Sequence, residues 1–273
     1  MNAPVPGAPI GVFDSGAGGL SIAAAIRAAL PAQDMVYYAD TAYAPYGLRS
    51  DQEILDRTQA CCARLLERPL AALVVACNTA TANAIEALRA WAPVPVVGVE
   101  PGLKPAAAAS RNGCVGVLAT RATLGSRRYR DLLYRVREQA PAVRFVEHAA
   151  VGWVELVENG ELDTAHARTL VRQAVQPLLD AGVDTLVLGC THYPFLRPEI
   201  ERVAAPVQII ETGPAVAREL LRRLRADPVS AAAASRTTPG DMRFESSGDA
   251  ERFAALARTL LAAGTHSAVA GAK

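Results

Sequence analysis

Short runs of β-branched and aliphatic residues alternate with longer helix-like segments along most of the chain. The predicted strands are residues 10–15, 35–40, 72–77, 94–99, 114–120, 143–149, 185–190 and 207–212. The predicted helices are residues 19–30, 50–67, 80–92, 126–140, 164–182 and 197–205. Strands that read as near-continuous apolar runs are buried on both faces, and their alternation with helices is typical of parallel pairing. The pattern predicts an α/β fold with mostly parallel sheets. A surface loop over residues 228–240 and a last strand and helix over 242–261 complete the prediction.

One part of the chain aligns with a later part without a gap. Residues 71–101 lie over 184–214, and this register places Cys77 over Cys190. A weaker match places the segment from Gly11 over the segment from Gly116. We interpret the chain as two pseudo-symmetric α/β domains, each with one cysteine at the end of a strand. Ligands of open α/β sheets bind beyond the carboxyl ends of the strands, so we expect the active site in a cleft between the domains. Two equivalent acid–base groups suit a reaction that takes a proton from one face of a carbon and returns one to the other.

Composition narrows the class of protein. The chain has 273 residues, 51% of them hydrophobic, and a formal net charge of +1. Without a basic tract, nucleic acid is not an expected partner, and charges or prolines interrupt every apolar run before it reaches membrane-spanning length. Residues 1–16 lack the basic head and long apolar body of a signal peptide, so we expect a cytoplasmic protein. The five cysteines form no C-x-x-C pair and are expected to be free thiols.

The two aligned cysteines have a structural and a functional interpretation. A cysteine at a strand end is often just a small buried apolar residue, and Cys61, Cys62 and Cys114 keep that interpretation. Cys77 and Cys190 differ because polar residues follow each of them at the start of a helix-like segment. Helix N-terminal amides or a nearby imidazole favour the thiolate.

Three further motifs also have two interpretations each. The segment from Asp14 to Ser21 is a glycine-rich turn that either only caps a helix or holds an anion with its backbone N–H groups. The Ala44–Gly47 turn is either a plain loop or a cover over a cleft that offers the Tyr46 hydroxyl. His192 either caps its own turn or assists Cys190; Cys-x-His without a second pair is not usual zinc spacing, so no metal is expected.

Taken together, the motifs resemble the cofactor-independent glutamate racemases of bacterial cell-wall synthesis, within the aspartate/glutamate racemase group. The resemblance runs from about Ile10 to Leu261 and rests on FDSGAGG, YGLRS, ACNTATA, GVEPGLKPA, TRATLGS, LVENG, LGCTHYPFL and SSGDAERF, which occur in this order. It implies an isomerase that interconverts L- and D-glutamate with two cysteine bases, supplies D-glutamate for peptidoglycan and cell shape, and forms a homodimer. It also implies a discontinuous first domain, residues 8–98 with 211–265, around a second domain, residues 99–210.

The resemblance also assigns roles to residues. Cys77 would take the proton from D-glutamate and Cys190 from L-glutamate, with Asp14 assisting the first thiol and His192 the second. Glu158 matches an acidic residue that relatives place near the second cysteine, although Glu155 is close enough to blur the register. The implied substrate contacts are Asp14, Ser15, Tyr46, Gly47, Asn78, Thr79, Thr120, Thr123, Thr191 and His192. Residues Glu211–Gly213 depart from the family pattern, which usually has Asp-Ser-Gly there.

The residues also bear on cofactors and on competing functions. Pyridoxal phosphate needs a Schiff-base lysine, and only Lys104 and Lys273 occur, so no cofactor is expected. The alternatives are a related enzyme acting on aspartate or a hydantoin, and a carboxylate-binding or regulatory protein that kept the fold without catalysis. Thr120 and Thr123 suit a substrate with a distal carboxylate, and the intact cysteine pair argues against a non-catalytic protein.

Overall fold

The computed structural model describes residues 7–226 and 238–268. The chain divides into two compact units, Met1–Val99 with Gly213–Lys273 and Glu100–Thr212. Most of the surface loop that we expect over residues 228–240 lies outside the described residues. The same is true of the first six residues of segment 1–16, which lacks the pattern of a signal peptide. Among the helices of the described part, none is both long and apolar enough to cross a membrane.

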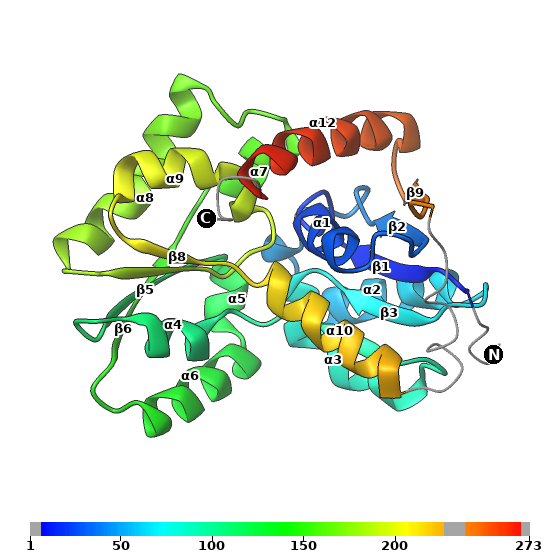
Figure 1. Ribbon diagram of the computed structural model, residues 1–273, viewed down its shortest axis with the longest axis horizontal. Coiled ribbons are helices and arrows are strands. Elements are labelled where there is room, and N and C mark those ends of the chain that lie inside the picture. Colours follow the sequence, from blue (N-terminus) through cyan, green and yellow to red (C-terminus); the bar gives the residue numbers. More distant parts are fainter. Residues whose placement is uncertain (1–6, 227–237, 269–273) are drawn as a thin grey trace. The chain divides into compact units, whose positions relative to one another are not determined.

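The first unit is built on a five-stranded parallel sheet. Its strands are β1 (Ile10–Asp14), β2 (Met35–Ala39), β3 (Ala72–Val75), β4 (Val96–Gly98) and β9 (Met242–Ser246), in the order β4-β3-β1-β2-β9. Its helices are α1 (Leu20–Ala29), α2 (Asp51–Leu65), α3 (Asn78–Trp91), α10 (Gly213–Ala226) and α12 (Ala250–Ala268). Helix α1 packs against α10 and α12, whereas α2 packs against α3 (Figure 1).

The second unit is built on a four-stranded parallel sheet. Its strands are β5 (Cys114–Ala119), β6 (Arg144–Ala149), β7 (Thr185–Leu188) and β8 (Gln208–Ile210), in the order β6-β5-β7-β8. Its helices are α4 (Leu103–Ala109), α5 (Arg121–Gly125), α6 (Arg127–Gln139), α7 (Trp153–Glu158), α8 (Ala165–Asp180) and α9 (Arg197–Ala204). Two 3-10 turns, η1 (Tyr46–Leu48) in the first unit and η2 (Tyr193–Leu196) in the second, complete the fold.

The strand order repeats between the units. When β9 is set aside and the first sheet is followed from β2 to β4, its order is β2-β1-β3-β4. The second sheet has the order β6-β5-β7-β8, so each of these strands has a counterpart at the same place in the other sheet. Strand β9 extends the first sheet only. This shared order confirms the prediction of two related α/β units with parallel sheets.

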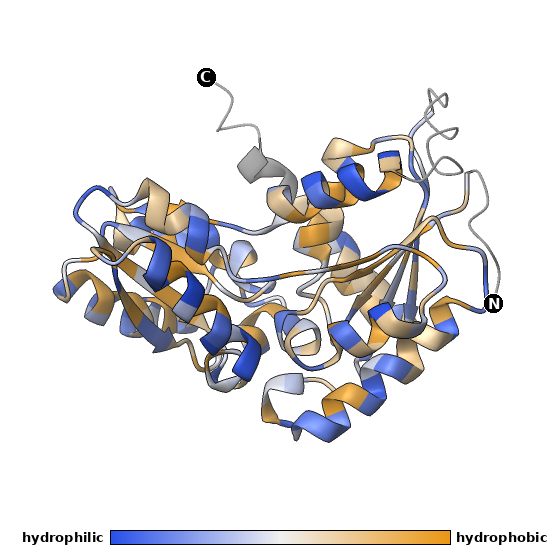
Figure 2. Cartoon of the chain, turned by 90° about the horizontal axis from the view of Figure 1, so that it is seen from below, coloured by the Kyte–Doolittle hydropathy of each residue, from blue (hydrophilic) through white to orange (hydrophobic). Residues whose placement is uncertain are grey.

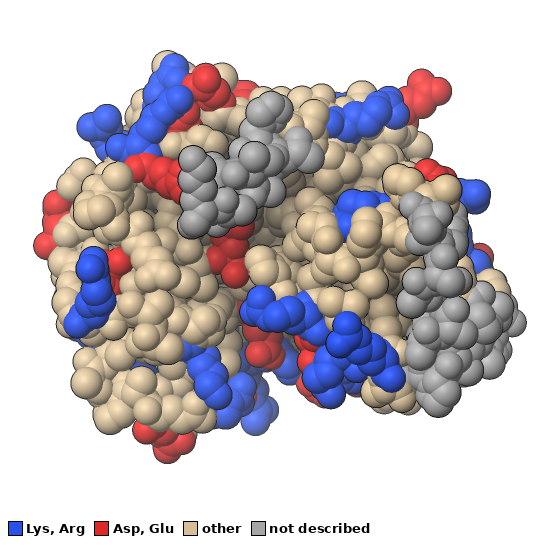
Figure 3. Space-filling view, viewed as in Figure 1, with Lys and Arg blue, Asp and Glu red and all other residues tan. Residues whose placement is uncertain are grey.

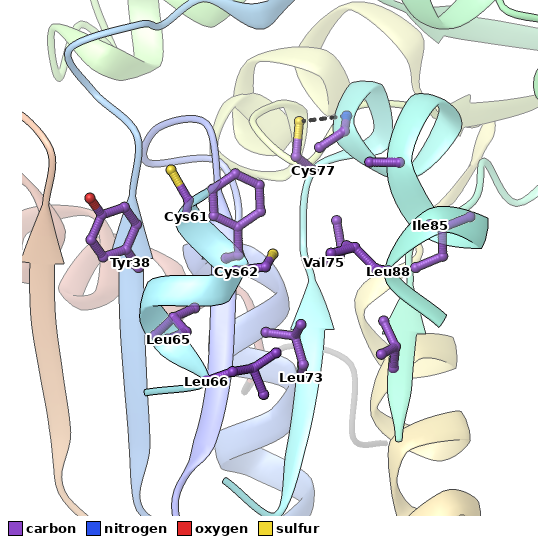
Figure 4. Packing of buried hydrophobic residues seen from close by; sticks show 14 of the residues in the cluster. Tyr38, Cys61, Cys62, Leu65, Leu66, Leu73, Val75, Cys77, Ile85 and Leu88 are labelled. Atoms are coloured by element: carbon purple, nitrogen blue, oxygen red, sulfur yellow. Dashed lines mark hydrogen bonds between the residues drawn. The ribbon is translucent and has the colours of Figure 1, made fainter. Parts of the chain in front are cut away.

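Hydrophobic burial explains why these segments form strands and amphipathic helices. Strands β1, β2 and β3 are buried along their whole length, as the near-continuous apolar runs predicted. Figure 2 shows hydrophobic strands, and helices that carry both hydrophilic and hydrophobic residues. In the first unit, side chains from α2, β3 and α3 pack together, including Leu65, Leu73 and Leu88 (Figure 4).

The order of the strands also sets where ligands bind. In each sheet the first and third strands are neighbours, and the chain leaves them for different helices: α1 follows β1, and α3 follows β3. Ligands of open α/β sheets bind at such a topological switch point, beyond the carboxyl ends of the strands. Asp14 and Cys77 lie at this point in the first unit, and Thr120 and Cys190 lie at the equivalent point in the second.

Candidate functional site

Cys77 is the residue that starts helix α3. Strand β3 ends at Val75, and the Cys77 sulfur accepts a hydrogen bond from the Ala80 amide at 3.4 Å, so the thiol is the N-cap of the helix (Figure 4). The Ser15 hydroxyl lies 3.6 Å from the same sulfur. The side chain is buried, with 6% of its residue surface exposed. A helix N-terminus favours a negative charge, so the position suits a thiolate.

The glycine-rich turn after β1 holds Asp14 close to this thiol's strand. The Asp14 carboxylate accepts a hydrogen bond from the Gly16 amide at 2.6 Å, and Tyr37 donates its hydroxyl to the Gly16 carbonyl at 2.9 Å. A Cβ at Gly19 would lie 2.7 Å from the Tyr37 hydroxyl and 2.8 Å from the Cβ atoms of Asp14 and Ala76. Only glycine fits there, because each of these distances is shorter than a normal van der Waals contact.

Asn78 is the most direct sign of a ligand in the first unit. It is buried, and within the described part of the chain neither its side-chain nitrogen nor its side-chain oxygen has a hydrogen-bond partner. A buried amide left in this way costs about 1–3 kcal/mol per polar group, so such groups normally have a partner. Thr79, the next residue, is also buried. The amide beside Cys77 is therefore placed to bind a polar molecule.

Tyr46 and Gly47 lie in the 3-10 turn after β2. Tyr46 is buried and donates its hydroxyl to Asp40 at 2.7 Å. Burial and this carboxylate both raise the pKa of Tyr46. Arg57 of α2 in turn donates two hydrogen bonds to Asp40. Asp40 and Arg57 are not among the residues predicted from the sequence, although Asp40 directly follows β2, at a strand end, much as Asp14 closes β1.

Cys190 is part of a chain of three side chains in the second unit. Its sulfur lies 3.7 Å from Nδ1 of His192, and Nε2 of His192 lies 2.7 Å from Oε1 of Glu158. Of the two candidate acidic residues, Glu158 is the one that hydrogen-bonds to the imidazole. His192 is 4% exposed.

The charge of His192 follows from its neighbours. Burial alone lowers its pKa, but the hydrogen bonds and charges of Cys190 and Glu158 outweigh burial and hold the pKa well above the usual 6.5. A protonated imidazole has an N–H on each ring nitrogen, so it donates toward the sulfur and toward the carboxylate together. The imidazole is therefore held between the sulfur of Cys190 and the carboxylate of Glu158.

The remaining predicted residues of the second unit lie around the ends of the neighbouring strands. The Gly189 amide bonds to the Leu118 carbonyl at 2.7 Å, which joins the ends of β7 and β5. Thr120 caps α5 by accepting from the Thr123 amide at 3.2 Å, and the two hydroxyls are 3.0 Å apart. Thr191, next to Cys190, is buried.

The other three cysteines are also buried, and two of them contact arginine: Nη2 of Arg57 lies 3.8 Å from the Cys61 sulfur, and Nη2 of Arg144 lies 3.1 Å from the Cys114 sulfur. Cys61 and Cys62 pack in the core of the first unit (Figure 4), and burial together with Asp40 raises the pKa of Cys61 to about 12. Cys114 is buried at the start of β5. Within residues 7–226 and 238–268, no group of three or more His, Cys, Asp or Glu side chains is arranged to hold a metal ion.

The chain is similar to known racemases over most of its length. The model of the Asp/Glu/Hydantoin racemase family matches residues 18–220. A glutamate racemase from Methylococcus capsulatus is 52% identical, with 89% of this chain and 88% of the relative covered. The crystal structure of glutamate racemase isoform RacE1 from Bacillus anthracis matches with a TM-score of 0.83 and 35% identity, covering 93% of this chain and 94% of that one.

A third match carries ligands. The Escherichia coli glutamate racemase, solved in complex with L-glutamate and the activator UDP-MurNAc-ala, has a TM-score of 0.80 and 34% identity, covering 94% of this chain and 96% of that one. By sequence and by fold, the chain belongs to the Asp/Glu/hydantoin racemase family and, within it, to the glutamate racemases.

Proposed function

We propose that the chain is a cofactor-independent glutamate racemase in which Cys77 and Cys190 are the two acid–base groups. The observation that carries the proposal is a thiol at the same strand end of two related units, each beside polar helpers. Glutamate as the substrate is supported by the 52% identical relative and by the Escherichia coli structure with L-glutamate. The unpaired Asn78 amide and the Thr120–Thr123 pair supply groups for its two carboxylates.

The proposed chemistry moves one proton in and one proton out. The Cys190 thiolate takes the α-proton of L-glutamate, the electron pair stays on Cα as an enolate-like state, and the Cys77 thiol delivers its proton to the opposite face. The product is D-glutamate, with Cys190 now a thiol and Cys77 a thiolate, and the reverse reaction exchanges these states. A thiol suits the task because its ordinary pKa of about 8.5 is near the working pH.

The helpers differ between the two thiols. His192, held by Glu158, stabilises the thiolate form of Cys190. On the other side, Ser15 and the α3 amides adjoin Cys77, and Asp14 assists proton movement there. The Asn78 amide, Thr79, Thr191 and the Tyr46–Gly47 backbone bind and orient the substrate. Such positioning is the main resource of an enzyme that has no electron sink.

The proposal extends to the biological setting. The product supplies D-glutamate for peptidoglycan synthesis, and a cytoplasmic location fits the free state of all five cysteines. On the face shown in Figure 3, basic side chains gather over α10, where Glu219 pairs with both Arg222 and Arg223, so this basic group is partly neutralised. We therefore propose a small-molecule partner rather than nucleic acid. From the resemblance to the family we also propose a homodimer, and two domains with bounds at residues 8–98 with 211–265 and 99–210.

A cofactor-free assay tests the function. Purified protein is incubated with each enantiomer of glutamate, with aspartate and with a hydantoin, in buffer without added cofactor, and rotation is followed by circular dichroism. We expect both glutamate enantiomers to converge on the racemate. Preference for aspartate or a hydantoin would assign another substrate in the same family, and no turnover of any substrate would favour a binding protein.

Substitution of the thiols tests the mechanism. Cys77→Ala and Cys190→Ala should each abolish racemisation in both directions, because every turnover needs one base and one acid. Cys62→Ala is the matched control for removing a buried thiol, and it should still racemise glutamate. Full turnover by a folded Cys77→Ala or Cys190→Ala protein would sink the two-base assignment.

A further inference from the structure

We propose that Arg57, on helix α2, is a positioning residue that fixes the turn carrying Tyr46 and Gly47. The inference rests on the proposed function, because it takes this turn as part of the glutamate site. Arg57 itself does not touch the reacting atoms in this account. It acts on the turn through two neighbours, Asp40 and Tyr43.

The first link is a buried ion pair. Arg57 donates from Nε to Oδ2 of Asp40 at 3.0 Å and from Nη2 to Oδ1 at 2.7 Å. The Asp40 side chain is 0% exposed, whereas that of Arg57 is 28% exposed. The Tyr46 hydroxyl donates to Oδ2 of the same carboxylate at 2.7 Å. Bidentate arginine–carboxylate bonds fix both distance and orientation, so Asp40 is a rigid acceptor for Tyr46.

The second link is direct. The Arg57 guanidinium carbon lies 3.7 Å from the centre of the Tyr43 ring, a close cation–π contact. Arg49 donates from Nε to the Tyr43 carbonyl at 3.0 Å. Arg57 thus contacts the start of the segment from Tyr43 to Tyr46 through the ring and its end through Asp40.

Residues 41 and 42, which precede this segment, are held by hydrogen bonds to the end of β9. The hydroxyls of Thr41 and Ser246 are 2.6 Å apart, and the Ala42 amide donates to Ser247 at 3.1 Å. Ser246 is the last residue of β9 and Ser247 follows it, and no step of the proposed mechanism uses either serine. Residues 41–42 are therefore held by Ser246 and Ser247, and residues 43–46 are held by Arg57. Of these two supports, Arg57 is the one nearer to Tyr46 and Gly47, the proposed substrate contacts.

The ion pair is permanent at working pH. Burial alone raises the pKa of Asp40, but hydrogen bonds from Arg57, Ser247 and Tyr46 outweigh it and place this pKa below the ordinary 3.8. The same pairing raises the pKa of Arg57. The arrangement is thus a fixed support for the turn over the working range of pH.

The test compares two arginines of α2. Arg57→Lys keeps the charge but loses the bidentate fork, and Arg64→Lys, whose guanidinium faces the Tyr38 ring at 5.7 Å, is the control. Steady-state kinetics with both enantiomers and amide hydrogen exchange are measured for each variant. The reporter amides are those of Leu48 and Arg49, which bond to Pro45 and Tyr46 within the turn.

For Arg57→Lys we expect KM to rise about tenfold or more with kcat nearly unchanged, since the bidentate bond that holds the substrate-binding turn in place is lost. The Leu48 and Arg49 amides should exchange faster by a similar factor, whereas Arg64→Lys should match the wild type in both measurements. If Arg57→Lys does not fold, the double variant Asp40→Asn/Arg57→Gln, which leaves no unpaired buried charge, should show the same two changes.

The two readouts separate the possible failures. If the wild type does not racemise glutamate, the proposed function fails, and faster exchange in Arg57→Lys would still show that Arg57 fixes the turn. If the wild type is active and a folded Arg57 variant keeps both the wild-type KM and the wild-type exchange rates, Arg57 is not a positioning residue. A fall in kcat alone, with unchanged exchange, also overturns the inference.

Discussion

The two thiols differ in the residues that surround them. Cys77 caps a helix and adjoins a hydroxyl, with Ser15 at 3.6 Å, whereas Cys190 adjoins an imidazole that is tied to a carboxylate. The first thiol faces the neutral dipoles of a helix N-terminus and a hydroxyl, whereas the second faces an ionisable imidazole. Equivalent positions in the fold therefore hold thiols with chemically different neighbours.

This inequality predicts directional effects of substitution. His192→Asn should weaken Cys190 as a base and so slow the chemical step from L- to D-glutamate more than the reverse step. Asp14→Asn should show the opposite bias, and the loss of general acid–base assistance should slow the affected step by about 10²- to 10⁴-fold. The ratio of the two kcat/KM values stays fixed by the equilibrium, so the bias is read from isotope effects with α-deuterated L- and D-glutamate. Identical changes in both directions for both variants would mean that these residues are general supports.

The helices and strands show how far sequence reasoning reaches. The strong apolar runs and the amphipathic segments were placed correctly, but strand ends were extended: the predicted strand over 72–77 ends at Val75, and Cys77 already caps α3. Helix α10 was missed although Val216, Ala217, Leu220 and Leu224 are buried at helical spacing. Helices α4, α5 and α7 have seven, five and six residues, too few for periodicity to identify.

The candidate site was predictable where it follows strand ends and not where it depends on packing. A polar residue after a buried strand is visible in the sequence, as for Cys77 and Cys190. The bond between Asp40 and Arg57 joins residues that are 17 positions apart in the sequence. They meet only because α2 folds back beside the end of β2, so the sequence alone does not reveal the contact. The same holds for the contact between Glu158 and His192, which lie 34 residues apart in the sequence.

The loop between α4 and β5 gives a prediction at the scale of elements. Asp184, just before β7, accepts from the Ser110 hydroxyl at 2.6 Å and from the amides of Arg111 and Asn112 at 2.7 and 2.8 Å. Burial alone would raise the pKa of Asp184, but these bonds outweigh it and lower the pKa from 3.8 to about 2. A carboxyl group with a depressed folded pKa stabilises the fold above its unfolded pKa, and this stability is lost as pH falls from about 4 through 2.

Asp184→Asn should therefore lower the melting temperature at neutral pH, and its difference from the wild type should shrink as the pH is lowered from 4 toward 2. Thermal unfolding followed by circular dichroism across this range measures the difference. Asp180→Asn is the control, because Asp180 accepts from Gln176 one helical turn away on α8. A constant gap between Asp184→Asn and wild type down to pH 2 would show that the loop gains nothing from the charge.

At the scale of the whole molecule, the repeated strand order places one thiol after the third strand of each unit, and the proposed mechanism uses both thiols. Sheets ordered β2-β1-β3-β4 and β6-β5-β7-β8 each end their third strand just before a cysteine. A racemase with a single base would use the same group to remove and to return the proton. With one thiol in each unit, one thiol removes the proton and the other returns one. The origin of the returned proton therefore distinguishes a two-base mechanism from a one-base mechanism.

Racemisation in deuterium oxide tests this division. Cys190 takes protium from L-glutamate, while Cys77, whose thiol exchanges with solvent, delivers deuterium to the other face. At low conversion, nearly all of the D-glutamate formed should therefore carry deuterium at Cα, and the recovered L-glutamate should remain protiated, because reversal returns the same protium from Cys190. Starting from D-glutamate, the labels should mirror this result. Mass spectrometry of the separated enantiomers measures both, and protium in the early product would mean that one group serves both faces.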